Sequence, residues 1–82
     1  MATKTFITRA ERHPVELRGF ALGPNRDSDI VVADLSYSGC RIQSQDAFSK
    51  GEVVELRIMK RGVAAAEIRW TDEDRAGARF LN

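Results

Sequence analysis

The chain has 82 residues, which is enough for one small hydrophobic core and too few for two. Hydrophobic residues make up 43% of the sequence and charged residues 30%, a composition typical of a folded domain rather than a disordered chain. Thirteen basic residues against twelve acidic ones give a formal net charge of +1, so no overall field favours nucleic acid or an anionic membrane. A domain this small has little room for a deep, water-excluding catalytic centre. We therefore expect a binding module and not an enzyme.

Apolar and polar residues alternate repeatedly along the chain, and helical three-and-four spacing is rare, so the sequence predicts a β-protein. Six strands are expected, at residues 15–22, 28–35, 40–43, 54–58, 64–70 and 78–81. Turn-forming residues separate the strands at 23–27, in a tight basic turn at 60–62 where Gly62 takes positive φ, and in a polar loop at 71–77. A single helical turn is expected at 47–50.

Six short strands joined by turns are typical of a small antiparallel barrel, because an open sheet would leave bare edges and a two-sheet sandwich usually needs about 100 residues. The inward faces are expected to include Val54, Leu56 and Ile58. Trp70 is expected in the core, because it has the same parity as Ile68 and the alanines before it.

Cys40 is the only cysteine, which excludes an intrachain disulfide and a cysteine-based zinc site within one copy. Its neighbours predict a small buried hydrophobe. No apolar stretch is long enough to span a bilayer, and the first eight residues lack the apolar run of a leader. We therefore expect a cytoplasmic protein without membrane insertion. The adjacent acids at 72–74 are expected to be solvated, so neither a metal nor a cofactor is predicted.

The segment from Asp34 to Gly39 predicts a polar corner between two strands. Asp34 and Ser36 are two positions apart and project to the same face of an extended backbone, while Gly39 permits a close backbone approach. A carboxylate and a hydroxyl together suit a donor-rich group such as the edge of guanine. The alternative is an Asx or Ser turn whose side chains cap their own backbone, and the spacing alone favours that alternative.

The second candidate is the run at 8–14, which carries Arg9, Arg12 and His13 before the first strand. Two guanidiniums on a flexible lead-in would fold over a phosphate-bearing ligand. The alternative is a solvated terminus, which is favoured when the run is considered alone. Ten of the thirteen basic residues are arginines, a bias that suits phosphate and guanine recognition but that a genome rich in G and C also produces.

An arginine-bearing arm, a barrel and the pattern Asp-x-Ser-x-x-Gly at Asp34, Ser36 and Gly39 together resemble PilZ domains. The resemblance covers nearly the whole chain and also includes Gly51, Trp70, Gly77 and Phe80. It implies a six-stranded barrel, divided here into a flexible arm at 1–13 and a barrel at 14–82, that binds the second messenger cyclic di-GMP and signals to a downstream protein partner. The implied ligand-binding residues are Arg9, Arg12, His13, Asp34, Ser36, Gly39 and Arg41.

The family's arm carries Arg-x-x-x-Arg, and this chain departs from that spacing. The fourth residue after Arg9 is His13, and the fourth after Arg12 is Glu16. The alternative function is therefore a degenerate PilZ domain that does not bind the nucleotide and acts through protein contacts. The C-terminal helix of many relatives is not expected here, which would leave an apolar patch for a homodimer mate or another partner. A nucleic-acid-binding barrel ranks last, because the net charge is near zero and no run of exposed aromatics is apparent.

Overall fold

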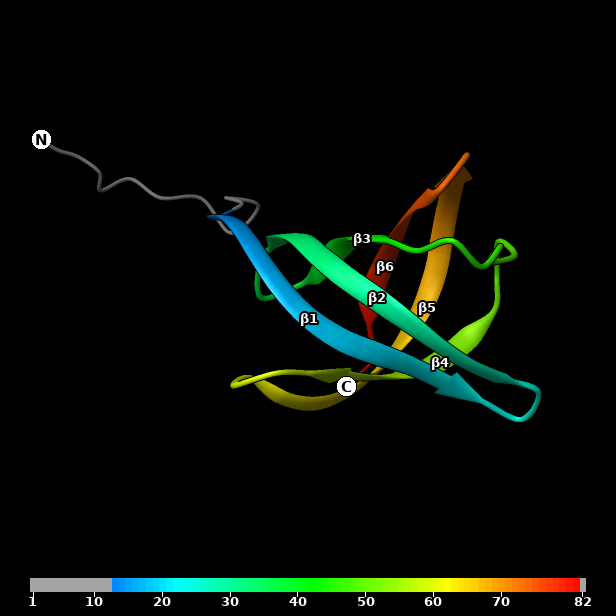
Figure 1. Cartoon of the computed structure of the whole chain (residues 1–82), viewed down its shortest axis with the longest axis horizontal. Helices are drawn as coiled ribbons and strands as arrows, with labels where there is room; N and C mark the ends of the chain where they lie inside the picture. Colours follow the sequence, from blue (N-terminus) through cyan, green and yellow to red (C-terminus); the bar gives the residue numbers. More distant parts are fainter. Residues whose placement is uncertain (1–12, 82) are drawn as a thin grey trace, which may run out of the picture.

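The computed structural model describes residues 13–81, and these residues form the closed six-stranded barrel that the sequence predicts (Figure 1). The strands are β1 (His13–Gly23), β2 (Arg26–Leu35), β3 (Gly39–Gln43), β4 (Val53–Ile58), β5 (Gly62–Asp72) and β6 (Arg75–Phe80). All neighbours pair antiparallel in the order β1-β2-β3-β6-β5-β4, and β4 pairs with β1 to close the barrel. Within this described range there is neither a helix that could cross a membrane nor a cluster of His, Cys, Asp or Glu suited to a metal ion.

The barrel interior is filled by aliphatic side chains from all six strands. The predicted inward residues Val54, Leu56 and Ile58 are buried, and Cys40 is 8% exposed, so both predictions are confirmed. The largest side chains that are completely enclosed are Val32, Ile42, Leu56 and Ile68. Ile42, Leu56 and Ile68 each lie between two polar residues, so this part of the core follows directly from the period-two pattern of the sequence.

Two expectations about connections are wrong. The polar loop expected at 71–77 is only the two-residue turn Glu73 and Asp74, because Asp72 pairs with Arg75 and the ladder continues to the turn. The helical turn expected at 47–50 is absent from the described structure. Side chains bind the backbone groups that such a turn would use: Arg26 donates to the Ala47 carbonyl, and the Ser49 amide donates to Glu52. Gly62 has a φ of 109°, as the tight turn before β5 requires.

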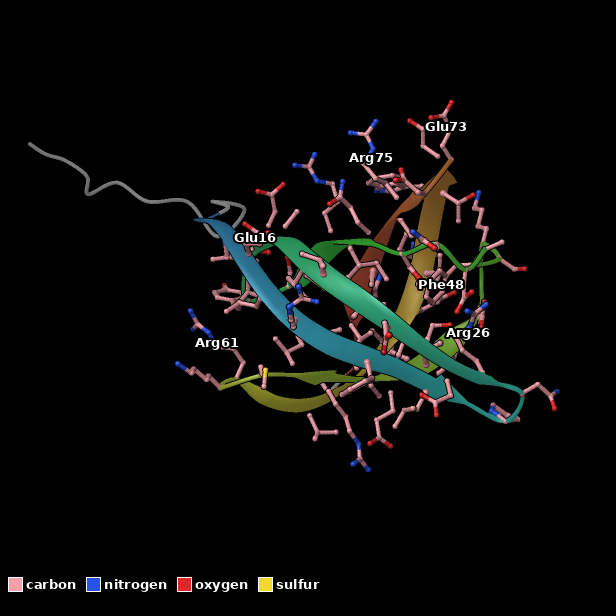
Figure 2. All side chains as sticks on the ribbon, viewed as in Figure 1. Glu16, Arg26, Phe48, Arg61, Glu73 and Arg75 are labelled. Atoms are coloured by element: carbon pink, nitrogen blue, oxygen red, sulfur yellow. The ribbon has the colours of Figure 1, made fainter. Side chains whose placement is uncertain are left out.

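Arg26 fastens the segment between β3 and β4 onto the barrel. Its guanidinium donates to both oxygens of Glu52, to the Ser28 hydroxyl and to the Ala47 carbonyl. It also lies 3.9 Å above the centre of the Phe48 ring, and the two labelled side chains are neighbours in Figure 2. This cluster lies near the β1–β2 turn, away from the end where β1 begins.

Strand pairing is irregular at three places, all near the end of the barrel where β1 begins and β2 ends. The register shifts between Pro14 and Leu17 in β1, between Val32 and Asp34 in β2, and between Ile68 and Trp70 in β5. Each shift is a β-bulge, in which one strand has an extra residue and the alternation of faces is interrupted. The bulges decide which side chains at this end face outward.

The expectation that Trp70 is a core residue is wrong, because Arg69 is the extra residue of the β5 bulge. Ile68 faces the interior, and without the bulge Trp70 would have the same orientation. With Arg69 inserted, Trp70 turns outward and is 40% exposed. Asp34 has the same parity as the buried Val32 and is turned outward in the same way, by the extra residue Ala33.

Candidate functional site

A cavity of about 260 Å³ lies on the barrel wall at the bulged end. One side is formed by the end of β2, the turn after it and the start of β3; the other is formed by the facing parts of β5 and β6. Its lining includes the three motif residues Asp34, Ser36 and Gly39. The sequence motif is therefore brought together in space around a hollow and is not dispersed over the surface.

One row of residues that pair across neighbouring strands runs through the site and crosses five strands. Pro14 of β1 pairs with Asp34, Asp34 with Arg41 of β3, Arg41 with Gly77 of β6, and Gly77 with Trp70 of β5. The side chains of Asp34, Arg41 and Trp70 in this row share a face of the sheet. The row thus connects the start of β1 with the aromatic side of the cavity through Asp34.

Asp34 is held by an ion pair with Arg41 across the β2–β3 ladder. Arg41 Nη2 lies 2.5 Å from Asp34 Oδ2, and the carboxylate side chain is largely covered. Arg41 does not line the cavity, so its link to the site is through Asp34. Arg41 Nε is buried and has no hydrogen-bond partner among the described residues. The pair fixes the carboxylate at the cavity while leaving lone pairs that can accept further hydrogen bonds.

Ser36 and Gly39 build the turn between β2 and β3. The Ser36 amide donates to the Gly39 carbonyl at 2.9 Å, and the Ser36 hydroxyl donates to the same oxygen at 3.2 Å. The capping-turn interpretation thus describes the local hydrogen bonding, while both residues also face the cavity. A Cβ on Gly39 would collide with the Ala78 carbonyl of β6, so the close backbone approach expected here is made by the neighbouring strand.

The opposite side of the cavity carries Arg69, Trp70 and Arg79. The Trp70 indole lies over Gly77, at a place where any side chain on residue 77 would collide with it. Arg69 faces outward as the residue after the buried Ile68, and Arg79 pairs across the ladder with Gly39. The sequence does not distinguish these two arginines, because outward-facing arginines are common on strands. The β5 bulge beside Arg69 also has no recognisable sequence pattern.

The arm residues Arg9 and Arg12 lie outside the described residues. His13 is the first residue of β1, and its backbone pairs with Leu35, next to the motif. The backbone of β1 therefore begins beside Asp34 and Leu35, two residues that line the cavity.

The charges near the cavity favour an anion. Asp34 is already paired with Arg41, and Glu67 lies 3.5 Å from Arg69. With Arg79 included, three guanidiniums face two carboxylates on this wall. Cys40 also borders the cavity, but burial raises the pKa of its thiol to about 12, so the thiolate is absent near neutral pH.

A closed antiparallel barrel with a hollow on its outer wall, lined by apolar, hydroxyl and charged residues, is typical of a small ligand-binding module. The family model of the PilZ domain matches residues 7–82, and the chain belongs to the PilZ family. PilZ domains are regulatory binding domains known in cyclic di-GMP signalling. No curated protein matches the chain.

Proposed function

We propose that this PilZ domain is a receptor for cyclic di-GMP and that the nucleotide binds in the cavity bordered by Asp34, Ser36 and Gly39. The observation that carries the proposal is the convergence of these three residues on one hollow, beside the point where β1 begins. The family match over residues 7–82 supports it, because PilZ domains are known in cyclic di-GMP signalling.

The chemistry of the corner suits a guanine base. Guanine presents N1–H and N2–H₂ donors on one edge, and an ionised carboxylate accepts such a pair through its oxygens. Asp34 is positioned for this by Arg41, which occupies one oxygen and leaves acceptor capacity at the other. The Ser36 hydroxyl adds a second polar contact on the same side of the cavity.

The cavity of about 260 Å³ is slightly below the roughly 300–1,000 Å³ usual for small-molecule sites, and in this proposal the arm adds to it. Arg9 and Arg12 precede β1 by only a few residues, and β1 begins at the cavity edge. In this proposal the ligand draws both arginines over the cavity, where they contact phosphate and guanine. The change in position of the arm is the signal passed to a downstream protein partner.

Calorimetric titration of the purified protein with cyclic di-GMP tests the proposal, with GTP as the control for non-specific anion binding. We expect saturable binding in the micromolar range that GTP does not reproduce. Asp34→Ala is expected to weaken the affinity about tenfold or more, because a charge-assisted hydrogen bond is lost. The matched control is Asp27→Ala, on an exposed carboxylate near the β1–β2 turn, far along the hairpin.

The arm is tested in the same assay by the double variant Arg9→Ala/Arg12→Ala, with Arg61→Ala in the β4–β5 turn as its control. If only the arm variant binds the nucleotide more weakly, the result would support the proposal that Arg9 and Arg12 contact the bound ligand. An unaltered protein that gives no heat and no shift in melting temperature at high ligand concentration would refute the receptor function.

A second function, protein contact without nucleotide, is favoured by one specific observation. Phe20 of β1, Arg57 of β4 and Val63 of β5 form a paired row on the outer face, and Phe20 and Val63 are 48% and 62% exposed. Large apolar residues that are exposed near one another on the same face of a sheet are typical of interaction surfaces. Sedimentation of the unaltered protein and of Phe20→Ser tests whether this face mediates self-association as a homodimer. A monomer at all concentrations, together with cyclic di-GMP binding, would exclude this alternative.

A further inference from the structure

We propose that Arg69 of β5 and Arg79 of β6 bind the phosphodiester groups of the nucleotide, an inference that rests on the proposed function. The barrel wall then supplies part of the phosphate-binding charge that the family places in the N-terminal arm.

Both arginines are on the side of the cavity that faces the motif. Arg69 comes from the β5 bulge, and Arg79 from the strand that pairs with β3. A ligand whose base meets Asp34 shares one cavity with both guanidiniums.

The ion pairing on the wall leaves these guanidiniums available. Arg41 is committed to Asp34 at 2.5 Å, whereas Arg69 meets Glu67 only at 3.5 Å with about half of its side chain exposed. Glu67 also pairs across the ladder with Arg79, so one carboxylate lies beside two cations. This wall has an excess of positive charge, and cyclic di-GMP carries one negative charge on each of its two phosphodiesters.

The planar geometry of the guanidinium group suits the binding of phosphate. A guanidinium presents several N–H donors in a planar fork and binds two phosphate oxygens at once. The sequence of the arm offers an independent reason to look for such groups on the barrel. The fourth residue after Arg9 is His13, and an imidazole lacks the planar fork of donors that a guanidinium offers to phosphate.

The test is calorimetric titration of cyclic di-GMP into Arg69→Gln and Arg79→Gln, with matched controls that carry the same change elsewhere. Arg57→Gln is the control for Arg69, because Arg57 is also an exposed strand arginine paired with a glutamate two residues before it. Arg75→Gln is the control for Arg79, on the same strand but at the β5–β6 turn, where Figure 2 labels it beside Glu73. Thermal melting of each variant shows whether it is folded.

We expect each cavity variant to weaken binding about tenfold, with the controls unchanged and with partial recovery in Arg69→Lys and Arg79→Lys, which keep the charge and lose the fork. Binding should also weaken with added salt, and less steeply in the cavity variants. If the unaltered protein binds and both cavity variants bind equally well, the phosphate role is overturned while the receptor function stands. If the unaltered protein does not bind, both proposals are overturned.

Discussion

Replacing Arg26 with alanine tests the energetic account of the loop cluster most directly. The guanidinium side chain is 15% exposed, and it donates to Glu52, to the buried Ser28 hydroxyl and to the Ala47 carbonyl. Alanine would leave the Glu52 carboxylate and the Ser28 hydroxyl without their cation. The substitution should therefore loosen the segment between β3 and β4.

The magnitude follows from the degree of burial. Breaking a fully buried ion pair costs about 3–5 kcal/mol, and an exposed pair contributes about 0–1 kcal/mol. Arg26 and Glu52 are largely covered but not fully buried, so we expect a loss of about 2–3 kcal/mol in the free energy of unfolding, including the contact with Phe48. At about 4–8 °C per kcal/mol for a domain of this size, the melting temperature should fall by about 10–20 °C.

Thermal and urea unfolding followed by circular dichroism measure this loss, with Arg57→Ala as the control. Arg57 also pairs with a glutamate but is exposed, so its removal should change the free energy of unfolding by less than about 1 kcal/mol. Nucleotide affinity of the folded Arg26→Ala protein should be unchanged, because Arg26 does not line the cavity. Equal losses in the two variants would refute the energetic argument.

Three further predictions concern other parts of the barrel. The hydrogen bond from Arg26 lowers the pKa of Glu52 below its ordinary value of 4.5, so the stability it contributes is complete above that pH and is lost as the pH falls through the lowered pKa. In urea unfolding measured across this pH range, the free energy of unfolding should fall more steeply with decreasing pH in the unaltered protein than in Glu52→Gln. Equal pH dependence in the two proteins would contradict this prediction. Cys40, with a pKa of about 12, should resist thiol reagents at neutral pH until the barrel unfolds, whereas labelling as fast as in urea would show that the thiol is accessible. Gly77→Ala should displace the indole of Trp70, the only tryptophan, and shift its fluorescence; an unchanged spectrum would place the indole elsewhere.

The strands and the core could be predicted from the sequence because they depend on alternation. Val54, Leu56 and Ile58 are buried in the order that a period-two pattern requires, and the glycine at 62 marks a turn. The joining of Asp34, Ser36 and Gly39 at one cavity also followed from the local motif.

The facing side of the cavity could not be predicted, because a bulge changes the parity of every residue after it. Trp70 was placed in the core by counting from Ile68, and the inserted Arg69 invalidates that count. Asp34 did offer a signal, since an acidic residue at the same parity as Ile30 and Val32 would otherwise face the core. No comparable signal precedes Trp70, where an apolar residue fits either side.

The single-residue length of the bulges has a consequence for how this barrel tolerates changes in chain length. Deleting Ala33 would restore regular alternation in β2 and turn the Asp34 carboxylate toward the aliphatic interior, where an unpaired charge is strongly unfavourable. Deleting Arg69 would likewise direct the bulky indole of Trp70 inward, against a core already filled by Ile42 and Leu56. Deletions at these two positions should therefore destabilise the barrel, whereas insertions at the exposed turn of Pro24 and Asn25 should be accepted.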